Sequence, residues 1–180
     1  MFATLLLIVG AYLIGSVSFA VIVSRAFGLP DPHAYGSGNP GATNVLRSGH
    51  RAAALLTLLG DGLKGFAVVF AAQHLAPGPG AAPWPVPVAA PAVFLGQVFP
   101  VLPRFRRERR GATAAGIVFA LHWPLGVALA AVWFTIAFGF RISSLAALVP
   151  AVLLPLVLSY AHGAWTEARE GVVLALVLFW

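Results

Sequence analysis

Long uncharged apolar runs, separated by short polar segments, dominate the chain. An α-helix crosses the bilayer core with roughly 20 apolar residues. Runs of about this length or more occupy residues 1–24, 52–76, 84–102, 112–140 and 142–160. We therefore expect an all-α protein, a polytopic bundle of transmembrane helices within a single domain spanning residues 1–180.

Three details bear on the number of spans. The run 112–140 is too long for one untilted helix and contains His122-Trp123-Pro124, so we expect either one kinked span or two short helices meeting there. Residues 171–180 are apolar but too short to cross alone. Residues 1–24 show no obvious basic n-region or cleavage site, which predicts a retained first span. The pattern leaves five to seven membrane helices.

Composition supports a membrane protein. Hydrophobic residues make up 60% of the chain and charged residues 9%, against about 25% in soluble domains, and the mean hydropathy is +0.92. This excludes an ordinary soluble enzyme, a disordered tail and a nucleic-acid-binding module, despite the net charge of +6. Cysteine is absent, which excludes disulfides, a thiol nucleophile and cysteine-ligated metal. We expect no metal site.

The basic residues predict an orientation. Residues 25–51 hold three arginines, and residues 104–110 hold five of the eleven basic residues. The segment 77–83 between two apolar runs has no charge. Because cytoplasmic loops are enriched in Lys and Arg, we expect an external N-terminus and both basic segments in the cytoplasm. Arg141 is then the one basic residue on the opposite side.

The first basic loop, residues 31–51, carries the most informative chemistry. It reads DPHAYGSGNPGATNVLRSGHR. Glycines let backbone N–H groups converge on one anion, hydroxyl and amide groups add donors, and an arginine matches phosphate oxygens. A helix starting near Thr43 would favour the same anion. These residue types also dominate ordinary turns, so a flexible cytoplasmic loop is the alternative. The candidate phosphate-binding residues are Gly36, Gly38, Asn39, Thr43, Asn44 and Arg47, together with Ser37.

A second polar feature is the pair Asp61 and Lys64 within an apolar run. At positions i and i+3 the two side chains share a helix face and can pair. One interpretation is an ion pair that makes burial tolerable, since ionised groups in a membrane are costly. The other is that Lys64 offsets a substrate's charge while Asp61 orients it. Both can hold together.

Two further features lie in the second half of the chain. The segment RFRRERR, residues 104–110, predicts an anchor against anionic headgroups, with an arginine that closes a phosphate site as the alternative. His162 follows an apolar run and precedes Glu167 and Arg169. A lone interfacial histidine is more often structural than catalytic. The other histidines show no metal-ligand spacing.

The order of residues in the first half resembles a known family. GSGNPGATNVLR (residues 36–47), followed by LLTLLGDGLKG (residues 55–65), resembles the bacterial acyl-phosphate-dependent glycerol-3-phosphate acyltransferases. Those are small polytopic inner-membrane enzymes that make lysophosphatidate. The pair Gly15-Ser16 and the chain length are also similar. The specificity of the resemblance is concentrated in residues 31–65.

The second half departs from the family's pattern. Gln97 stands where the family has histidine, and a Gly-Gly-Lys-Gly stretch is replaced by residues 107–110, with Arg109 at the lysine position. An Arg-His pair followed by Asn survives only as His162, with Trp165 at the Asn position. His33 likewise replaces an arginine after Asp31.

The resemblance implies an acyltransferase that moves a fatty acyl group from acyl phosphate to sn-glycerol 3-phosphate, in the bacterial inner membrane and in phospholipid biosynthesis. It implies no cofactor, and as partners the two substrates, membrane lipids and a soluble enzyme that produces acyl phosphate. Ser37 is a candidate catalytic residue and His162 a candidate general base. Arg109, Thr113 and Lys64 are candidates for the second phosphate, supported by Asp61.

Two other functions remain open. The lost glycines and asparagine motivate an inactive paralogue that still binds an anionic lipid or glycerol phosphate. Asp61 and Lys64 inside the membrane motivate a small transporter.

Overall fold

The computed structural model describes residues 2–75, 85–101 and 111–139. Within these residues all regular structure is α-helical. The helices are α1 (Phe2–Gly15), α2 (Phe19–Ala26), α3 (Ala42–Leu46), α4 (Arg51–His74), α5 (Pro85–Val98), α6 (Gly111–Leu121) and α7 (Trp123–Gly139).

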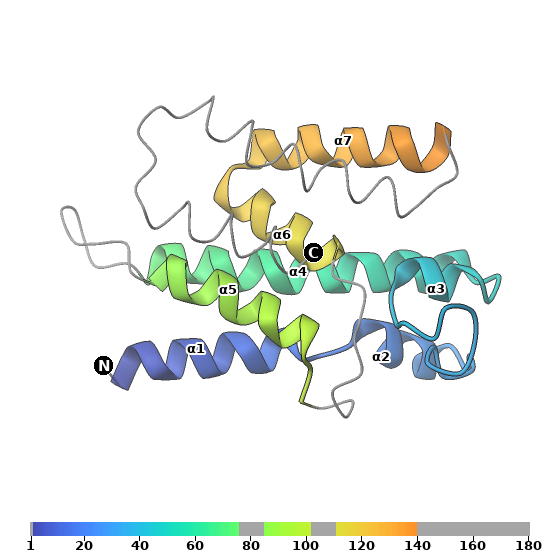
Figure 1. The fold of residues 1–180 in the computed structure, drawn as a ribbon, viewed down its shortest axis with the longest axis horizontal. Coiled ribbons are helices and arrows are strands. Elements are labelled where there is room, and N and C mark those ends of the chain that lie inside the picture. Colours follow the sequence, from blue (N-terminus) through green and yellow to red (C-terminus); the bar gives the residue numbers. More distant parts are fainter. Residues whose placement is uncertain (1, 76–84, 102–110, 140–180) are drawn as a thin grey trace.

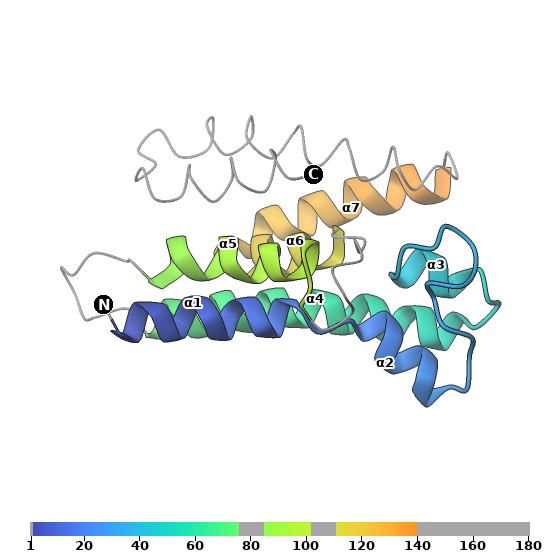
Figure 2. The ribbon, with the colours of Figure 1, turned by 60° about the horizontal axis from the view of Figure 1, so that its bottom comes forward.

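Helix α4 is the central element of the described bundle (Figure 1). It contacts α1, α2, α3, α5 and α6, and its most extensive contact is with α6. Helix α1 lies beside α4, α5 packs across both, and α7 packs on α6 (Figure 2). The segment between α2 and α4, which includes α3, lies at one end of the bundle, opposite the start of α5. This segment, called the first polar loop (residues 27–50), therefore lies apart from the main apolar core formed by α1, α4, α5 and α6.

The helices differ in their capacity to span a membrane. Within the described residues, α4 has the length and apolarity to cross alone. Helices α1 and α2 pass the same test as a pair, but the chain bends by 44° between them. Helices α5, α6 and α7 are apolar and shorter. The predicted second span, residues 52–76, thus agrees closely with α4.

Two predicted runs are divided in the structure. Residues 1–24 were predicted as one span, but they form α1 and most of α2, with Ser18 as the N-cap of α2. The run 112–140 divides at His122, as the two-helix alternative predicts. The His122 ring accepts a hydrogen bond from the backbone N–H of Leu125 at 3.3 Å, and Pro124 lies in the first turn, where no backbone donor is needed. Both divisions occur where side chains can cap a new helix.

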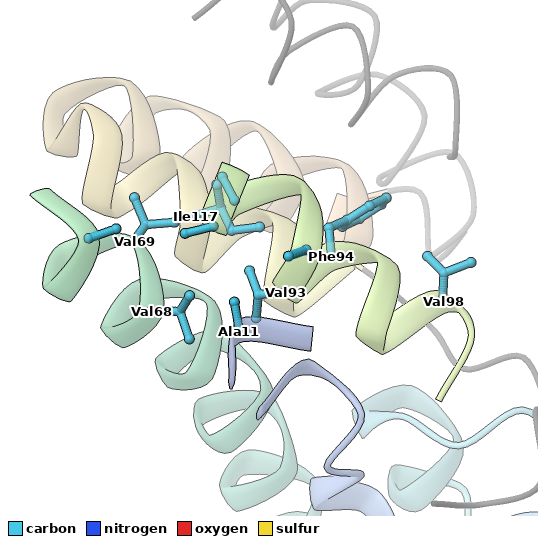
Figure 3. Close-up of a cluster of buried hydrophobic side chains, with 11 residues drawn as sticks. Ala11, Val68, Val69, Val93, Phe94, Val98 and Ile117 are labelled. Atoms are coloured by element: carbon cyan, nitrogen blue, oxygen red, sulfur yellow. The ribbon is translucent and has the colours of Figure 1, made fainter. Parts of the chain in front are cut away.

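Small residues allow close packing in the core. Ala11 of α1, Val68 and Val69 of α4, Val93 of α5 and Ile117 of α6 form one buried cluster (Figure 3). Glycines lie where neighbouring backbones meet: a Cβ added at Gly15 would collide with the Val93 carbonyl, at Gly96 with the Tyr12 carbonyl, and at Gly116 with the Gly62 carbonyl. Such small-residue contacts are typical of helix packing in membranes.

Large apolar side chains lie mainly on the outside of the bundle. They include Phe2, Leu5, Leu13, Leu55, Leu59, Leu63, Phe70 and Trp123. An outer surface of this kind is costly in water and favourable against lipid. The described helices therefore have the surface expected for a membrane-embedded bundle.

Candidate functional site

The first polar loop, residues 27–50, is anchored by a small apolar cluster beneath it. Ala20 and Val23 of α2, Val45 of α3, and Ala53 and Ala54 of α4 are buried together. Pro32 and Pro40 of the loop are also fully buried. Packing of this kind restricts the loop's backbone, which favours an ordered loop over the flexible cytoplasmic loop of the alternative interpretation.

Asn44 of α3 holds the loop together through its side chain. Its Oδ1 accepts hydrogen bonds from the Ser37 backbone N–H at 2.9 Å and from the Ser37 hydroxyl at 3.3 Å. Its Nδ2 donates to the carbonyl oxygens of Pro32 at 2.7 Å and Tyr35 at 3.2 Å. Asn44 is 1% exposed. The sequence predicted Asn44 as a phosphate ligand. In the structure, its amide group is hydrogen-bonded to atoms of the loop itself.

Two glycines adopt backbone conformations that side chains disfavour. Gly36 has φ 61° and Gly38 has φ 67°. A Cβ on Gly36 would collide with Asn44 Oδ1 and would lie 3.3 Å from Arg47 Cδ. The arginine stem therefore runs beside the Gly36 turn. Positive φ at both positions explains why glycine stands there, whereas the predicted role of these glycines in binding an anion stays a prediction.

The exposed part of the loop carries the remaining predicted residues. Ser37, Asn39 and Arg47 are exposed, and Thr43 is half-buried at the start of α3. Within the described residues, no hydrogen bond or ion pair engages the Asn39 amide or the Arg47 guanidinium. An available guanidinium next to glycine turns and a hydroxyl is suited to binding an anion such as phosphate.

Asp31 and His33 form an ordered turn at the start of the loop. Asp31 Oδ1 accepts from the His33 backbone N–H at 2.9 Å and lies 2.7 Å from His33 Nδ1. The backbone N–H, followed by the imidazole and Arg25, lowers the pKa of Asp31 below its usual value. Within the described part of the chain, His33 Nε2 and the Tyr35 hydroxyl are buried without a hydrogen-bond partner.

A second polar cluster lies at the middle of α4. Asp61 and Lys64 form the predicted ion pair, with Lys64 Nζ 3.0 Å from Asp61 Oδ1 and both side chains 3% exposed. Lys64 Nζ also donates to the Val17 carbonyl at 2.5 Å, and the Thr113 hydroxyl donates to the Asp61 carbonyl at 3.0 Å. With a rise of 1.5 Å per residue, Asp61 lies about 15 Å along the axis from Arg51. Lys64 thus bonds to the α1–α2 bend and Thr113 bonds to α4, and neither bonds to the first polar loop.

The remaining predicted site residues lie outside the described part. These are Arg109 and His162, and with them the basic segment 104–110 and Trp165. Gln97, at the position where the resemblance expects histidine, is buried in α5.

The sequence analysis did not identify the residues that contribute through their backbone carbonyl groups. The carbonyl groups of Val17, Pro32 and Tyr35 each accept from a buried polar side chain. The two serines flanking Val17 gave a signal for a helix break, because Ser18 is a favourable N-cap residue. Pro32 and Tyr35 gave no comparable signal, since any residue presents a carbonyl.

Comparison with known proteins relates nearly the whole chain to one protein family. The family described as "Glycerol-3-phosphate acyltransferase" matches residues 5–180. A protein of that name from Cupriavidus pinatubonensis is 52% identical over 176 residues, covering 98% of this chain and 86% of the relative. One from Ralstonia pickettii is 58% identical over 153 residues, covering 85% of this chain and 74% of the relative.

Solved structures give the same result. The crystal structure of PlsY (YgiH), "an integral membrane glycerol 3-phosphate acyltransferase" in "the glycerol 3-phosphate form", matches with a TM-score of 0.86 and 28% identity, covering 98% of this chain and 86% of the other. Its lysophosphatidic acid form matches with a TM-score of 0.81, covering 98% and 84%. The predicted all-α integral membrane fold and the family resemblance are confirmed.

Proposed function

Because the chain belongs to the glycerol-3-phosphate acyltransferase family, we propose that it transfers a fatty acyl group from acyl phosphate to a hydroxyl of sn-glycerol 3-phosphate. The hydroxyl oxygen attacks the acyl carbon, the bond from that carbon to the phosphate oxygen breaks, and the hydroxyl proton passes to a base. The products are lysophosphatidate and inorganic phosphate. Acyl phosphate is already activated, so the reaction needs no covalent intermediate and no cofactor.

The observation that carries the proposal is the ordered first polar loop with its available guanidinium. Gly36 and Gly38 make turns that expose backbone, Ser37 presents a hydroxyl, and Arg47 runs beside them. Asn39 adds an amide, and Thr43 supports the loop at the start of α3. A preorganised set of donors stabilises phosphate charge without rearranging during the reaction. We assign one substrate phosphate to this loop.

The second phosphate and the proton transfer fall to residues of the second half. Arg109 is the proposed ligand for the second phosphate, and its charge replaces that of the family's lysine. His162 is the proposed general base, with a substrate phosphate oxygen as its alternative. Lys64 and Thr113, which the sequence also suggested for this phosphate, are assigned here to holding helices, because their polar atoms bond to Val17 and Asp61.

Location follows from the same chemistry. The acyl chain lies in the lipid or between helices, while both phosphate groups stay at the rim of the bundle. The three arginines of residues 25–51 favour the cytoplasmic side of a bacterial inner membrane. On that side a soluble enzyme can supply acyl phosphate. Rate enhancement then comes mainly from positioning two charged substrates.

The proposal is tested with the protein in native membranes or liposomes. Acyl phosphate and labelled glycerol 3-phosphate should give labelled lysophosphatidate with one phosphate released per product, whereas acyl-CoA should give none. Ser37→Ala should lower the rate at least tenfold, about 1.4 kcal/mol of transition-state stabilisation.

A matched control is Ser48→Ala, since the Ser48 hydroxyl donates locally to the Val45 carbonyl at 2.7 Å. Full activity of Ser37→Ala would contradict the loop assignment. Binding of glycerol 3-phosphate without turnover would instead support the inactive paralogue, and solute flux into liposomes would support a transporter.

A further inference from the structure

We propose that Asp61 and Lys64 act as a helix-break clamp: they fix the bend between α1 and α2 from the side of α4, and so position the first polar loop. In this role they are positioning residues and do not touch substrate. The effect on turnover rests on the proposed function, whereas the effect on the bend does not.

The bend leaves backbone groups that need partners. Helix α1 ends at Gly15 and α2 begins at Phe19, with a 44° bend between them. A helix end leaves carbonyl and N–H groups without intrahelical partners, and inside a membrane no water replaces them. Ser18 serves one of them, because its side chain accepts from the Val21 N–H at 3.4 Å.

The clamp bonds directly to the bend. Lys64 Nζ donates to the Val17 carbonyl at 2.5 Å, between the end of α1 and the start of α2. The Asp61 and Lys64 side chains are 3.0 Å apart and both 3% exposed. Each charge therefore has its partner in the other, and the Lys64 ammonium has a second partner in the Val17 carbonyl.

Packing around the clamp leaves it little freedom. The Phe19 ring lies so close to Gly60 that a Cβ on Gly60 would collide with it. On the far side of this turn of α4, the Thr113 hydroxyl donates to the Asp61 carbonyl at 3.0 Å. The clamp thus holds the start of α2 in a fixed position relative to α4.

Helix α2 carries this constraint to the loop. It has eight residues and ends at Ala26, where the first polar loop begins. Its length is about 12 Å, so a tilt of about 10° at the bend would move its far end by roughly 2 Å. Misplacement of catalytic groups by about 1 Å can cost ~100-fold in rate. A loosened bend is therefore sufficient to disable the loop.

The clamp differs testably from a pair that merely neutralises buried charge. Reversing the pair in Asp61→Lys/Lys64→Asp keeps both charges and their spacing, but it places a carboxylate, which cannot donate, at the position from which Lys64 donates to the Val17 carbonyl. We expect Lys64→Met and the reversed pair each to lower kcat/KM at least tenfold, while Lys64→Arg stays within about threefold. Reversed-pair activity near wild type would overturn the proposal.

A second measurement reports the bend without activity. The natural chain has no cysteine, so spin labels at Leu6→Cys and Ala26→Cys, both exposed positions, report the distance between α1 and the end of α2. We expect one narrow distance distribution in the clamped protein, and a broadened or shifted one in Lys64→Met and in the reversed pair. An unchanged distribution in both variants would overturn the clamp, even if the wild type showed no acyl transfer.

Thr57→Val serves as the matched control on the same helix. The Thr57 hydroxyl is buried and donates to the Ala53 carbonyl within α4 at 2.8 Å, so this variant removes a buried polar group without touching the bend. It should keep the wild-type distance distribution and activity within about threefold. If it broadened the distribution as much as Lys64→Met, the clamp would lose its specificity and the proposal would fail.

Discussion

The first polar loop and the middle of α4 contain similar residue types but put them to different uses. In the loop, Ser37, Asn39 and Arg47 are exposed, and the guanidinium has no partner within the described residues. At the middle of α4, Asp61 and Lys64 are buried and bond to each other, and Lys64 also donates to the backbone of the α1–α2 bend. Polar residues available for a ligand are thus distinguished by their partners, not by their type.

The physical cause of this difference is the surrounding medium. A buried charge without a partner costs several kcal/mol, so a polar residue inside the bundle persists when protein groups satisfy it. At the end of the bundle, water satisfies polar groups and can be exchanged for a substrate phosphate. The comparison predicts that substitutions in the loop mainly change activity, whereas substitutions at the middle of α4 also change stability or helix geometry.

The largest effect is expected for Asn44→Asp. This change keeps the acceptor for Ser37 but removes both donors to the Pro32 and Tyr35 carbonyls and places a charge beside them. Each unsatisfied buried group costs about 1–3 kcal/mol, which predicts a loss of ~100-fold or more in kcat/KM. Steady-state kinetics and protease cleavage of the loop would measure it. Wild-type kinetics would show that Asn44 does not hold the loop.

The next largest effect is expected for Gly116→Ala, at the contact of α6 with α4. The added methyl group collides with the Gly62 carbonyl oxygen, and overpacking of this kind costs about 1–3 kcal/mol. Thermal unfolding in detergent should show lower stability. Gly10→Ala is the control, because its Cβ meets no atom within 4 Å. Equal melting temperatures for both variants would contradict the close approach of α4 and α6.

A smaller and more specific effect is expected for Arg47→Ala. It should lower kcat/KM at least tenfold, about 1.4 kcal/mol, and leave thermal stability unchanged, since the described structure gives the guanidinium no partner. Arg51→Ala removes the same charge from an exposed position at the start of α4. Equal losses in the two variants would indicate general attraction of anions and would weaken the assignment of Arg47 to a phosphate.

The smallest effect concerns pH. The pKa of Asp31 is lowered in the folded loop, mainly by the His33 backbone N–H. The carboxylate therefore stabilises the loop above its unfolded pKa of about 3.9, and this contribution is lost as the pH falls through the lower folded value. Because Asp31 is exposed, the gain is small. Protease cleavage of the loop should accelerate on acidification in wild type and more weakly in Asp31→Asn; identical profiles would count against this turn.

Local spacing predicted several features of the fold and the candidate site. The apolar run 52–76 gave α4, the i, i+3 spacing gave the ion pair of Asp61 and Lys64, and the glycines of the first loop gave turns with positive φ. Each of these depends on neighbours within a few residues. The roles proposed for Arg109 and His162 stay predictions, because both lie outside the described residues.

Other features depend on contacts between distant parts of the chain. Lys64 bonds to a carbonyl 47 positions away, and Asn44 bonds to one 12 positions away. A carbonyl group is the same in every residue, so no pattern marks Val17 or Pro32 as a partner. The 44° bend within the predicted first span, residues 1–24, has the same basis, because Lys64 of α4 donates to the Val17 carbonyl at the break.

The amino-acid sequence by itself determined the class of the protein, because long apolar runs with few charges are stable as helices in lipid and a glycine-rich order of polar residues forms turns locally. Tertiary structure decided which polar groups remain available. Burial pairs Asp61 and Lys64 at the middle of α4 with each other, whereas the end of the bundle leaves Ser37, Asn39 and Arg47 exposed.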